Sequence, residues 1–306
     1  MNLGFYRSNY LPGILAGTAA VATIVISQPA MAKTAREVAQ IAVPTTVQIN
    51  NIVAPNLGGS GVIISKNGKT YTVLTASHVV ENPNTDYSIK TSKKKEHKVT
   101  SVKSFRKDNS GPDLAIVTFE TDEEYAVAPL TNSNEATIGS GVYISGYPVA
   151  SVGVNERRYS FTSGIITTEG ISDSEGYTLR YDAVTDKGMS GGPVFDVSGR
   201  VIGIHGHGEA KGSIIVEKGE PEKGQSEKGQ AVFKNGFNLA IPINTFVSQM
   251  SQVGMDKSAL KIDDKPPANV EVETVKQSDV DNWAADFGKE ILKDVIRGGL
   301  RRLLPF

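Results

Sequence analysis

The amino-acid sequence predicts an all-β protein, on three observations. Short apolar runs recur between residues 43 and 250, separated by residues that favour turns. The 31 glycines supply the many turns that a chain of short strands needs. Asn67-Gly68, between two apolar runs, is a strong hairpin signal. A chain of 306 residues is also long enough for more than one barrel or domain.

The composition excludes several kinds of site. The chain has no cysteine, so it forms no disulfide, no thiolate nucleophile and no cysteine-ligated metal centre. Its formal net charge of −1 gives no overall basic field, and we expect no nucleic-acid partner. With 39% apolar and 21% charged residues, the chain has the ordinary composition of a soluble globular protein.

Residues 1–32 have the pattern of an export signal. Arg7 precedes an apolar stretch at 11–26, and Ala30-Met31-Ala32 places small residues where a signal peptidase cleaves. We therefore expect cleavage after Ala32 and a secreted or periplasmic protein. The less favoured alternative is an uncleaved membrane anchor that makes the chain an anchored scaffold.

The first half is expected to begin with a short helix at 33–40. Strands are expected at 43–53, 62–65, 71–75 and 114–119, with a turn at 58–61 and a solvated hairpin within 83–112. An acidic connector at 120–137 then leads to the second half.

The second half repeats this pattern, with strands expected at 141–146, 159–167, 177–183, 200–205 and 237–241 and a helix from 243 to 250. The insertion at 206–235 contains Glu-Lys-Gly copies that begin at Glu217, Glu222 and Glu227. It offers few apolar side chains for packing, so we expect a mobile loop. An inert surface loop is favoured over one that gates a substrate cleft.

The end of the chain predicts a linker at 263–277 and an amphipathic helix at 278–306. Apolar residues of the helix recur at three- and four-residue steps, and its end is basic. We expect this helix to pack on the body or bind a partner. Contact with a membrane surface is the less favoured alternative.

The stretch 185–193 is the first candidate for chemistry. Ser190 lies among glycines, which let the backbone take positive φ and let a substrate come close. A tight turn there aims the N–H groups of Gly188 and Ser190 at one point, as an oxyanion hole requires. A serine nucleophile also needs a base, and the base needs a group that orients it.

Two residues in the first half have the right chemistry for those roles. Of the four histidines, His78 lies at the end of a predicted strand, and Asp113 precedes another strand. Each residue taken alone has a structural explanation. His78 is then a histidine whose hydrogen bonds are satisfied at a strand end, Asp113 a strand cap and Ser190 a serine in a turn. Their order and the glycine-rich surround together favour catalysis.

These motifs resemble those of the trypsin-like serine peptidases, at residues 75–78, 113–117 and 188–193. The resemblance covers roughly residues 40–250. It implies a peptidase domain at 33–262, a double β-barrel of the chymotrypsin type with barrels at about 40–135 and 136–250. It also implies protein or peptide substrates and no cofactor.

The resemblance further implies a role for each residue of the site. His78 is the general base, Asp113 orients the imidazole, Ser190 is the nucleophile, and the N–H groups of Gly188 and Ser190 bind the oxyanion. The alternative is a catalytically inactive, peptide-binding homologue. Met189 stands where many bacterial members of the family carry Asn or Asp just before the nucleophile. We expect its side chain to face the cleft and to change the rim of the pocket without disturbing the N–H geometry.

A closer resemblance is to the secreted bacterial glutamyl endopeptidases, carried by 181–182, Thr185 and 203–205. It implies that Thr185 and His205 line the primary pocket and read an acidic P1 side chain. Val184 stands six residues before Ser190, where basic specificity needs an aspartate. The sequence after the barrels lacks the character of a second peptide-binding domain, which disfavours the heat-shock type.

A metal site is the remaining alternative. The candidate ligands are His205, His207 and Glu209. The spacing of the two histidines puts both rings on one face of a strand. Glycines separate these residues and no further ligand cluster is evident, so we expect no metal.

Overall fold

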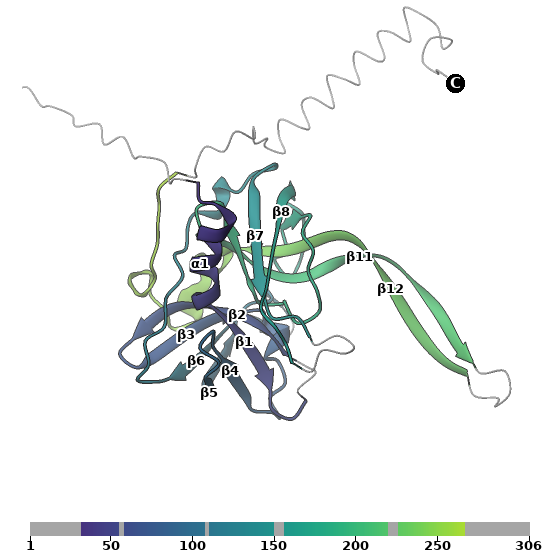
Figure 1. Ribbon diagram of the computed structural model, residues 1–306, viewed down its shortest axis with the longest axis horizontal. Helices are drawn as coiled ribbons and strands as arrows, with labels where there is room; N and C mark the ends of the chain where they lie inside the picture. Colours follow the sequence, from purple (N-terminus) through teal and green to yellow (C-terminus); the bar gives the residue numbers. More distant parts are fainter. Residues whose placement is uncertain (1–31, 55–57, 108–109, 150–155, 220–225, 267–306) are drawn as a thin grey trace, which may run out of the picture.

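The computed structural model describes residues 32–54, 58–107, 110–149, 156–219 and 226–266, with the backbone alone for 210–219 and 226–235. Within these residues, the strands form two closed antiparallel barrels of six strands each (Figure 1). The strand order is β1-β2-β3-β6-β5-β4 in the first barrel and β10-β11-β12-β9-β8-β7 in the second. The all-β, chymotrypsin-type double barrel expected from the sequence is confirmed.

The first barrel follows a helix, α1 (Ala35–Thr45). Its strands are β1 (Thr46–Asn51), β2 (Gly58–Asn67), β3 (Thr70–Thr75), β4 (Tyr87–Lys90), β5 (Glu96–Ser104) and β6 (Ala115–Glu120). The Asn67-Gly68 turn joins β2 to β3 as expected, and Gly68 takes a φ of +59°. The expected polar hairpin is the antiparallel pair of β4 and β5.

Two expectations for this half were wrong. The helix is longer than 33–40 and includes Pro44, because Val38 and Ala42 on one face are fully buried against the barrels. The expected turn at 58–61 is the start of β2. Gly59 needs no side chain there: a Cβ would lie 2.5 Å from a Val79 methyl and 2.7 Å from the carbonyl oxygen of Ser190.

The second barrel contains β7 (Gly141–Gly146), β8 (Ser160–Glu169), β9 (Leu179–Tyr181), β10 (Pro193–Asp196), β11 (Val201–Gly219) and β12 (Ser226–Pro242). The helix α2 (Ile243–Gln249) follows, as expected. The insertion expected as a mobile loop is instead a ribbon, since β11 and β12 stay paired as far as Gly219 and Ser226. Pairing satisfies backbone hydrogen bonds without apolar packing. Figure 1 shows this ribbon extending away from the barrels.

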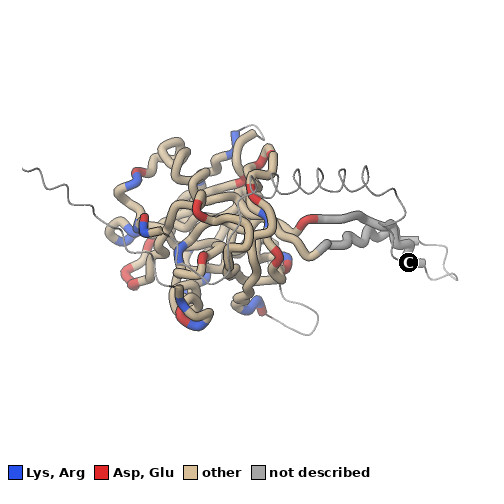
Figure 2. The backbone as a smooth tube through the Cα atoms, turned by 90° about the horizontal axis from the view of Figure 1, so that it is seen from above, with Lys and Arg blue, Asp and Glu red and all other residues tan. Residues whose placement is uncertain are grey.

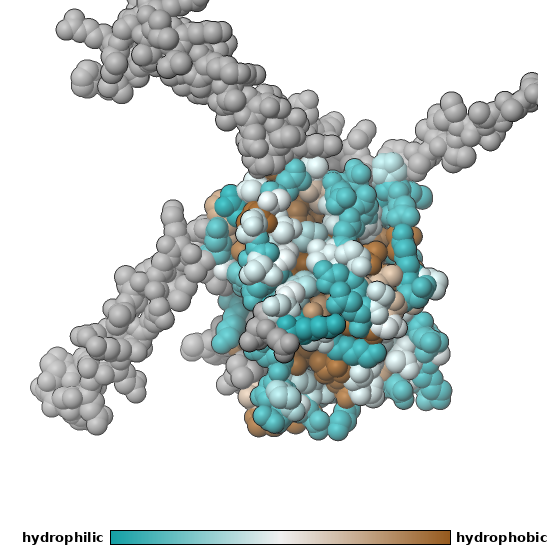
Figure 3. All heavy atoms as spheres, turned by 180° about the vertical axis from the view of Figure 1, so that it is seen from behind, coloured by the Kyte–Doolittle hydropathy of each residue, from teal (hydrophilic) through white to brown (hydrophobic). Residues whose placement is uncertain are grey.

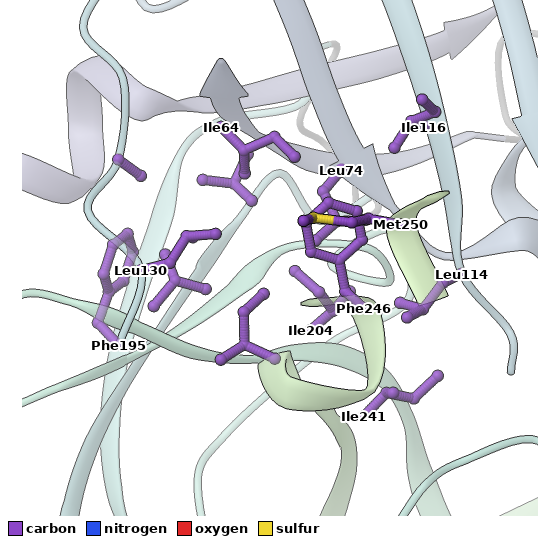
Figure 4. Close-up of a cluster of buried hydrophobic side chains, with 14 of the residues drawn as sticks. Ile64, Leu74, Leu114, Ile116, Leu130, Phe195, Ile204, Ile241, Phe246 and Met250 are labelled. Carbon is purple, nitrogen blue, oxygen red and sulfur yellow. The ribbon is translucent and has the colours of Figure 1, made fainter. Parts of the chain in front are cut away.

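Three apolar clusters hold the described body together. One fills the first barrel and one the second. The third lies between them, where Ile64 and Leu74 of the first barrel meet Phe195 and Ile204 of the second and Phe246 of α2 (Figure 4). This shared core fixes the two barrels relative to each other. It thereby fixes the loops around His78, Asp113 and Ser190 at the junction of the barrels, which we call the crevice.

The described surface is mixed in character. Lysines and arginines are interspersed with acidic residues along the backbone (Figure 2), and polar and apolar side chains alternate over the visible face (Figure 3). No helix among the described residues has the length and apolar character needed to span a membrane.

The terminal segments fall largely beyond the described part of the chain. The export signal up to residue 31 and the helix expected at 278–306 both lie outside it. The start of the expected linker is packed instead of free. Arg200 is buried and donates hydrogen bonds to the carbonyls of Asp263 and Lys265, at 3.4 and 2.6 Å. The body therefore continues past the expected boundary at residue 262.

Candidate active site

His78 and Asp113 lie side by side because their strands do. The end of β3 pairs with the start of β6, with Thr75 opposite Ala115. The Asp113 carboxylate accepts a hydrogen bond from the His78 backbone N–H through Oδ1 at 2.9 Å, and from the ring through Oδ2, which lies 2.6 Å from Nδ1. This pairing keeps the imidazole proton on Nδ1 and leaves Nε2 for proton transfer. The His78 side chain is 35% exposed, so it is accessible to a substrate.

Asp113 itself is 2% exposed, and several hydrogen-bond donors and charged groups surround its carboxylate. The Tyr177 hydroxyl donates to Oδ2 at 2.5 Å, and the Arg106 guanidinium lies 3.7 Å from Oδ1. Burial acts to raise the pKa of Asp113, but the hydrogen bonds and charge of His78, with the Tyr177 hydroxyl, outweigh it and lower that pKa to about 2. The carboxylate is therefore ionised at neutral pH.

The Ser190 loop is pressed against the segment that leads to His78. Gly191 has a φ of +82°, and a Cβ on it would lie 2.1 Å from Thr75 Oγ1 and 2.9 Å from the backbone nitrogen of Ala76. The Ser190 carbonyl also accepts from the Ser60 N–H at 2.8 Å. Glycine at position 191 thus permits the close approach that brings Ser190 of the second barrel to the His78 side of the crevice.

The Ser190 hydroxyl is turned toward β11. Its Oγ donates to the Gly206 carbonyl at 2.6 Å, and among the described residues no hydrogen bond joins it to the His78 ring. Proton transfer to His78 therefore requires the Ser190 side chain to rotate out of this bond.

The two predicted oxyanion donors face away from the hydrogen bonds that anchor their loop. The Lys187 carbonyl accepts from the Val149 N–H at 2.7 Å, and the Met189 carbonyl accepts from the Gly192 N–H at 2.9 Å. In a trans peptide the next N–H points the opposite way. The N–H groups of Gly188 and Ser190 are thereby turned away from these anchors, and neither has an acceptor among the described residues.

Sequence reasoning missed the residue that ties this loop to the first barrel. Arg157 donates to the carbonyls of Ile49, Gly59, Tyr147 and Gly188, with distances to Gly59 and Gly188 of 2.8 and 3.0 Å. Burial lowers the pKa of Arg157 to about 10, and the group remains a cation at neutral pH. Nothing in the Arg157-Arg158 dipeptide distinguishes the first arginine from a surface residue.

The two predicted pocket residues are joined indirectly. Thr185 donates to Asn238 of β12, while the buried His205 ring has its Nδ1 2.6 Å from the Tyr181 hydroxyl. Asn238 and Tyr181 are cross-strand partners. Val184 is 80% exposed, so it does not form the base of a closed pocket.

The remaining histidines and Glu209 have separate surroundings. The His207 ring lies against Tyr177, Glu209 lies 3.8 Å from Arg180, and the His97 ring is within hydrogen-bond distance of Tyr125. No group of three histidine, aspartate or glutamate side chains suited to a metal occurs in the described part of the chain.

Comparison with known proteins agrees with this architecture. Residues 59–204 match the model of the trypsin-like peptidase domain. The chain is 32% identical over 152 residues to the serine protease Do-like HtrA of Bacillus subtilis, and 31% identical over 150 residues to a probable periplasmic serine endoprotease DegP-like of Hahella chejuensis. These alignments cover 48% of this chain but 32% and 29% of the two relatives.

A third relative, the serine protease Do-like HtrA of Lactococcus lactis, is 28% identical over 152 residues and is covered over 36% of its length. The chain thus spans about a third of the length of these relatives. They carry HtrA and DegP names, so the finer resemblance to glutamyl endopeptidases receives no support from them. The double barrel, the hydrogen bonds between His78 and Asp113, and this shared region make residues 59–204 similar to trypsin-like peptidase domains.

Proposed function

We propose that the chain is a secreted or periplasmic serine endopeptidase that cleaves peptide bonds through an acyl-enzyme. The observation that carries the proposal is the two-point contact of Asp113 with His78, next to a glycine-rich loop that presents Ser190. That contact orients a base whose second nitrogen is free for a proton, which a structural histidine does not need.

The reaction follows from the chemistry of these groups. Ser190 rotates from Gly206, and its Oγ attacks the scissile carbonyl carbon while His78 Nε2 takes its proton. The N–H groups of Gly188 and Ser190 bind the oxyanion. His78 then gives the proton to the leaving amine as the C–N bond breaks. Water, activated by the same imidazole, releases the acyl group and restores Ser190.

A fluorophosphonate probe tests this function, because Ser190 Oγ bonds to phosphorus as fluoride leaves. We expect labelling of the full chain that disappears in Ser190→Ala and His78→Ala. Wild-type protein that is folded but neither labels nor cleaves a mixed peptide library would exclude the endopeptidase.

A catalytically inactive peptide-binding homologue is the second candidate. It is favoured by one observation, the bond of Ser190 Oγ to Gly206 in place of His78. In that case the library peptides bind without cleavage, and Ser190→Ala leaves their affinity unchanged.

An acidic P1 preference belongs to the same proposal. Thr185 and His205 both carry groups able to donate to a carboxylate. Thr185 contacts Asn238 and His205 contacts Tyr181, and these two partners lie opposite each other on neighbouring strands. Peptides that vary only at P1 test it. Faster cleavage after Glu than after Leu or Lys, reduced in Thr185→Val, is expected, and equal turnover of the three excludes the preference.

The location is proposed from the export signal together with the names of the DegP-like relatives. The expected mature protein begins at Lys33, and sequencing its first residues from an exported sample tests this. A chain that retains residues 1–32 would support the anchored alternative.

A further inference from the structure

Tyr177 reaches across the crevice to the carboxylate that orients His78. It lies just before β9 of the second barrel and is 1% exposed. Its hydroxyl donates to Oδ2 of Asp113 at 2.5 Å, the same oxygen that faces the His78 ring at 2.6 Å. The buried carboxylate is therefore held from both barrels at once.

The space for the Tyr177 ring exists because residue 206 is glycine. A Cβ at Gly206 would lie 1.9 Å from Cε1 and 2.3 Å from both Cζ and the hydroxyl oxygen of Tyr177. The phenol thus occupies the volume that a side chain at 206 would need. The carbonyl of the same glycine accepts the Ser190 hydroxyl. Gly206 lies between the proposed nucleophile and the group that holds Asp113.

The segment that carries Tyr177 is itself anchored. The Tyr177 N–H donates to Asp173 Oδ1 at 3.1 Å, and the Asp113 N–H donates to the Glu175 carbonyl at 2.8 Å. Arg106 pairs with the Glu175 carboxylate. The segment 173–177 therefore meets Asp113 through both backbone and side chain, and the phenol has little freedom to leave.

We propose that Tyr177 is a positioning residue for the peptidase reaction, fixing the Asp113 carboxylate and through it the His78 imidazole, in a space that requires glycine at 206. The inference rests on the proposed function. A hydrogen bond to a buried charge is stronger than one between neutral groups, so losing this one lets the carboxylate turn away from the imidazole. Tyr177 touches neither the substrate nor the reacting atoms.

The first test is Tyr177→Phe, which removes only the hydroxyl. We expect kcat to fall about ten- to a hundredfold, from the loss of one charge-assisted hydrogen bond, with KM unchanged. Tyr71→Phe is the matched control. Its buried hydroxyl donates to the Glu123 carbonyl at 3.2 Å, on the first barrel, so its removal is expected to lower stability without lowering kcat.

The second test exchanges the two residues. Gly206→Ser alone is expected to displace the phenol and lower kcat. In Tyr177→Ala with Gly206→Ser, the serine hydroxyl occupies the vacated volume beside Asp113. This double variant is expected to regain about tenfold in kcat over Tyr177→Ala, from one restored hydrogen bond to the carboxylate. A merely structural role for Tyr177 predicts no such rescue.

The outcomes separate the two proposals. A wild-type chain that does not react with fluorophosphonate refutes the proposed function. A reactive wild type with Tyr177→Phe at full kcat refutes the positioning role and leaves the peptidase intact. Circular dichroism gives the folded fraction of each variant. If Tyr177→Phe does not fold, Gly206→Ala tests the positioning role instead, because the added methyl displaces the phenol without removing it. Full kcat in Gly206→Ala would refute the positioning role of Tyr177.

Discussion

Replacing Arg157 by methionine is expected to slow acyl transfer by loosening the oxyanion loop. The guanidinium donates to four carbonyls, one of which belongs to Gly188, whose N–H is a proposed oxyanion donor. Methionine keeps much of the apolar stem and removes every donor. The Gly188 carbonyl keeps one partner, the Ser60 hydroxyl at 2.9 Å.

The magnitude follows from these contacts. A hydrogen bond from a charged group contributes about 1.5–3 kcal/mol, but removing a partly buried cation also recovers its desolvation cost. We therefore expect Arg157→Met to lower the free energy of unfolding by about 2–4 kcal/mol, well below the sum of four bonds. Loss of a whole oxyanion donor costs about a hundred- to a thousandfold in kcat. Since Ser60 still holds the loop, about ten- to a hundredfold is expected.

Urea unfolding and steady-state kinetics on one peptide measure both effects, with Arg158→Met as the control. Arg158 is exposed and adjacent in sequence, so its replacement should change neither quantity. For Arg157→Lys we expect a kcat and a free energy of unfolding between those of the wild type and Arg157→Met, because an ammonium cannot reach four carbonyls together. An Arg157→Met protein with wild-type kcat and stability would show that the loop does not depend on this arginine.

Three further predictions concern the crevice. Asp113→Asn should lower kcat about 10⁴-fold, because an amide no longer selects the imidazole tautomer with its proton on Nδ1; a loss below tenfold in steady-state assays contradicts this role. The pKa of Asp113 falls from 3.8 to about 2 on folding, so its contribution to stability is present above pH 4 and is lost as the pH falls toward 2. That contribution is about 2 kcal/mol, and urea midpoints between pH 2 and 5 should vary less in Asp113→Asn than in wild type. Gly191→Ala should destabilise the fold by about 3 kcal/mol or more, because its Cβ meets Thr75 Oγ1 at 2.1 Å. Gly68→Ala, which has positive φ but no atom within 4 Å of its Cβ, should cost about 1 kcal/mol, and equal costs for the two would refute the steric argument.

Most strands could be predicted from the sequence because strand signals are local, whereas their closure into two barrels was implied by the family resemblance. The Asn67-Gly68 turn and the apolar run after Asp113 each predict their structure from neighbouring residues alone. The errors were also local. Residues 43–45 were expected to begin a strand but form the end of α1, and the glycines at 58–61 suggested a turn but form part of β2. In both places, packing between distant segments outweighed local preference.

The residues of the candidate site could be predicted from the sequence only in part. The motifs around His78, Asp113 and Ser190 predicted which residues to examine, and the structure brings the first two into contact. Tyr177 and Arg157 were missed, since neither lies in a motif and each acts on residues far away in the chain. The hydrogen bond from the Ser190 hydroxyl to the Gly206 carbonyl could not be predicted either, because the rotamer of Ser190 depends on the acceptors that the fold places around it.

By itself, the sequence determined the fold class, the three motifs and the absence of cysteine chemistry, because each depends on residue type and on neighbours along the chain. Only the tertiary structure decided which groups hold Asp113, which cation ties down Gly188 and what space remains at Gly206. Those contacts join separate strands and loops across the crevice, and their geometry is set by how the two barrels pack on their shared core.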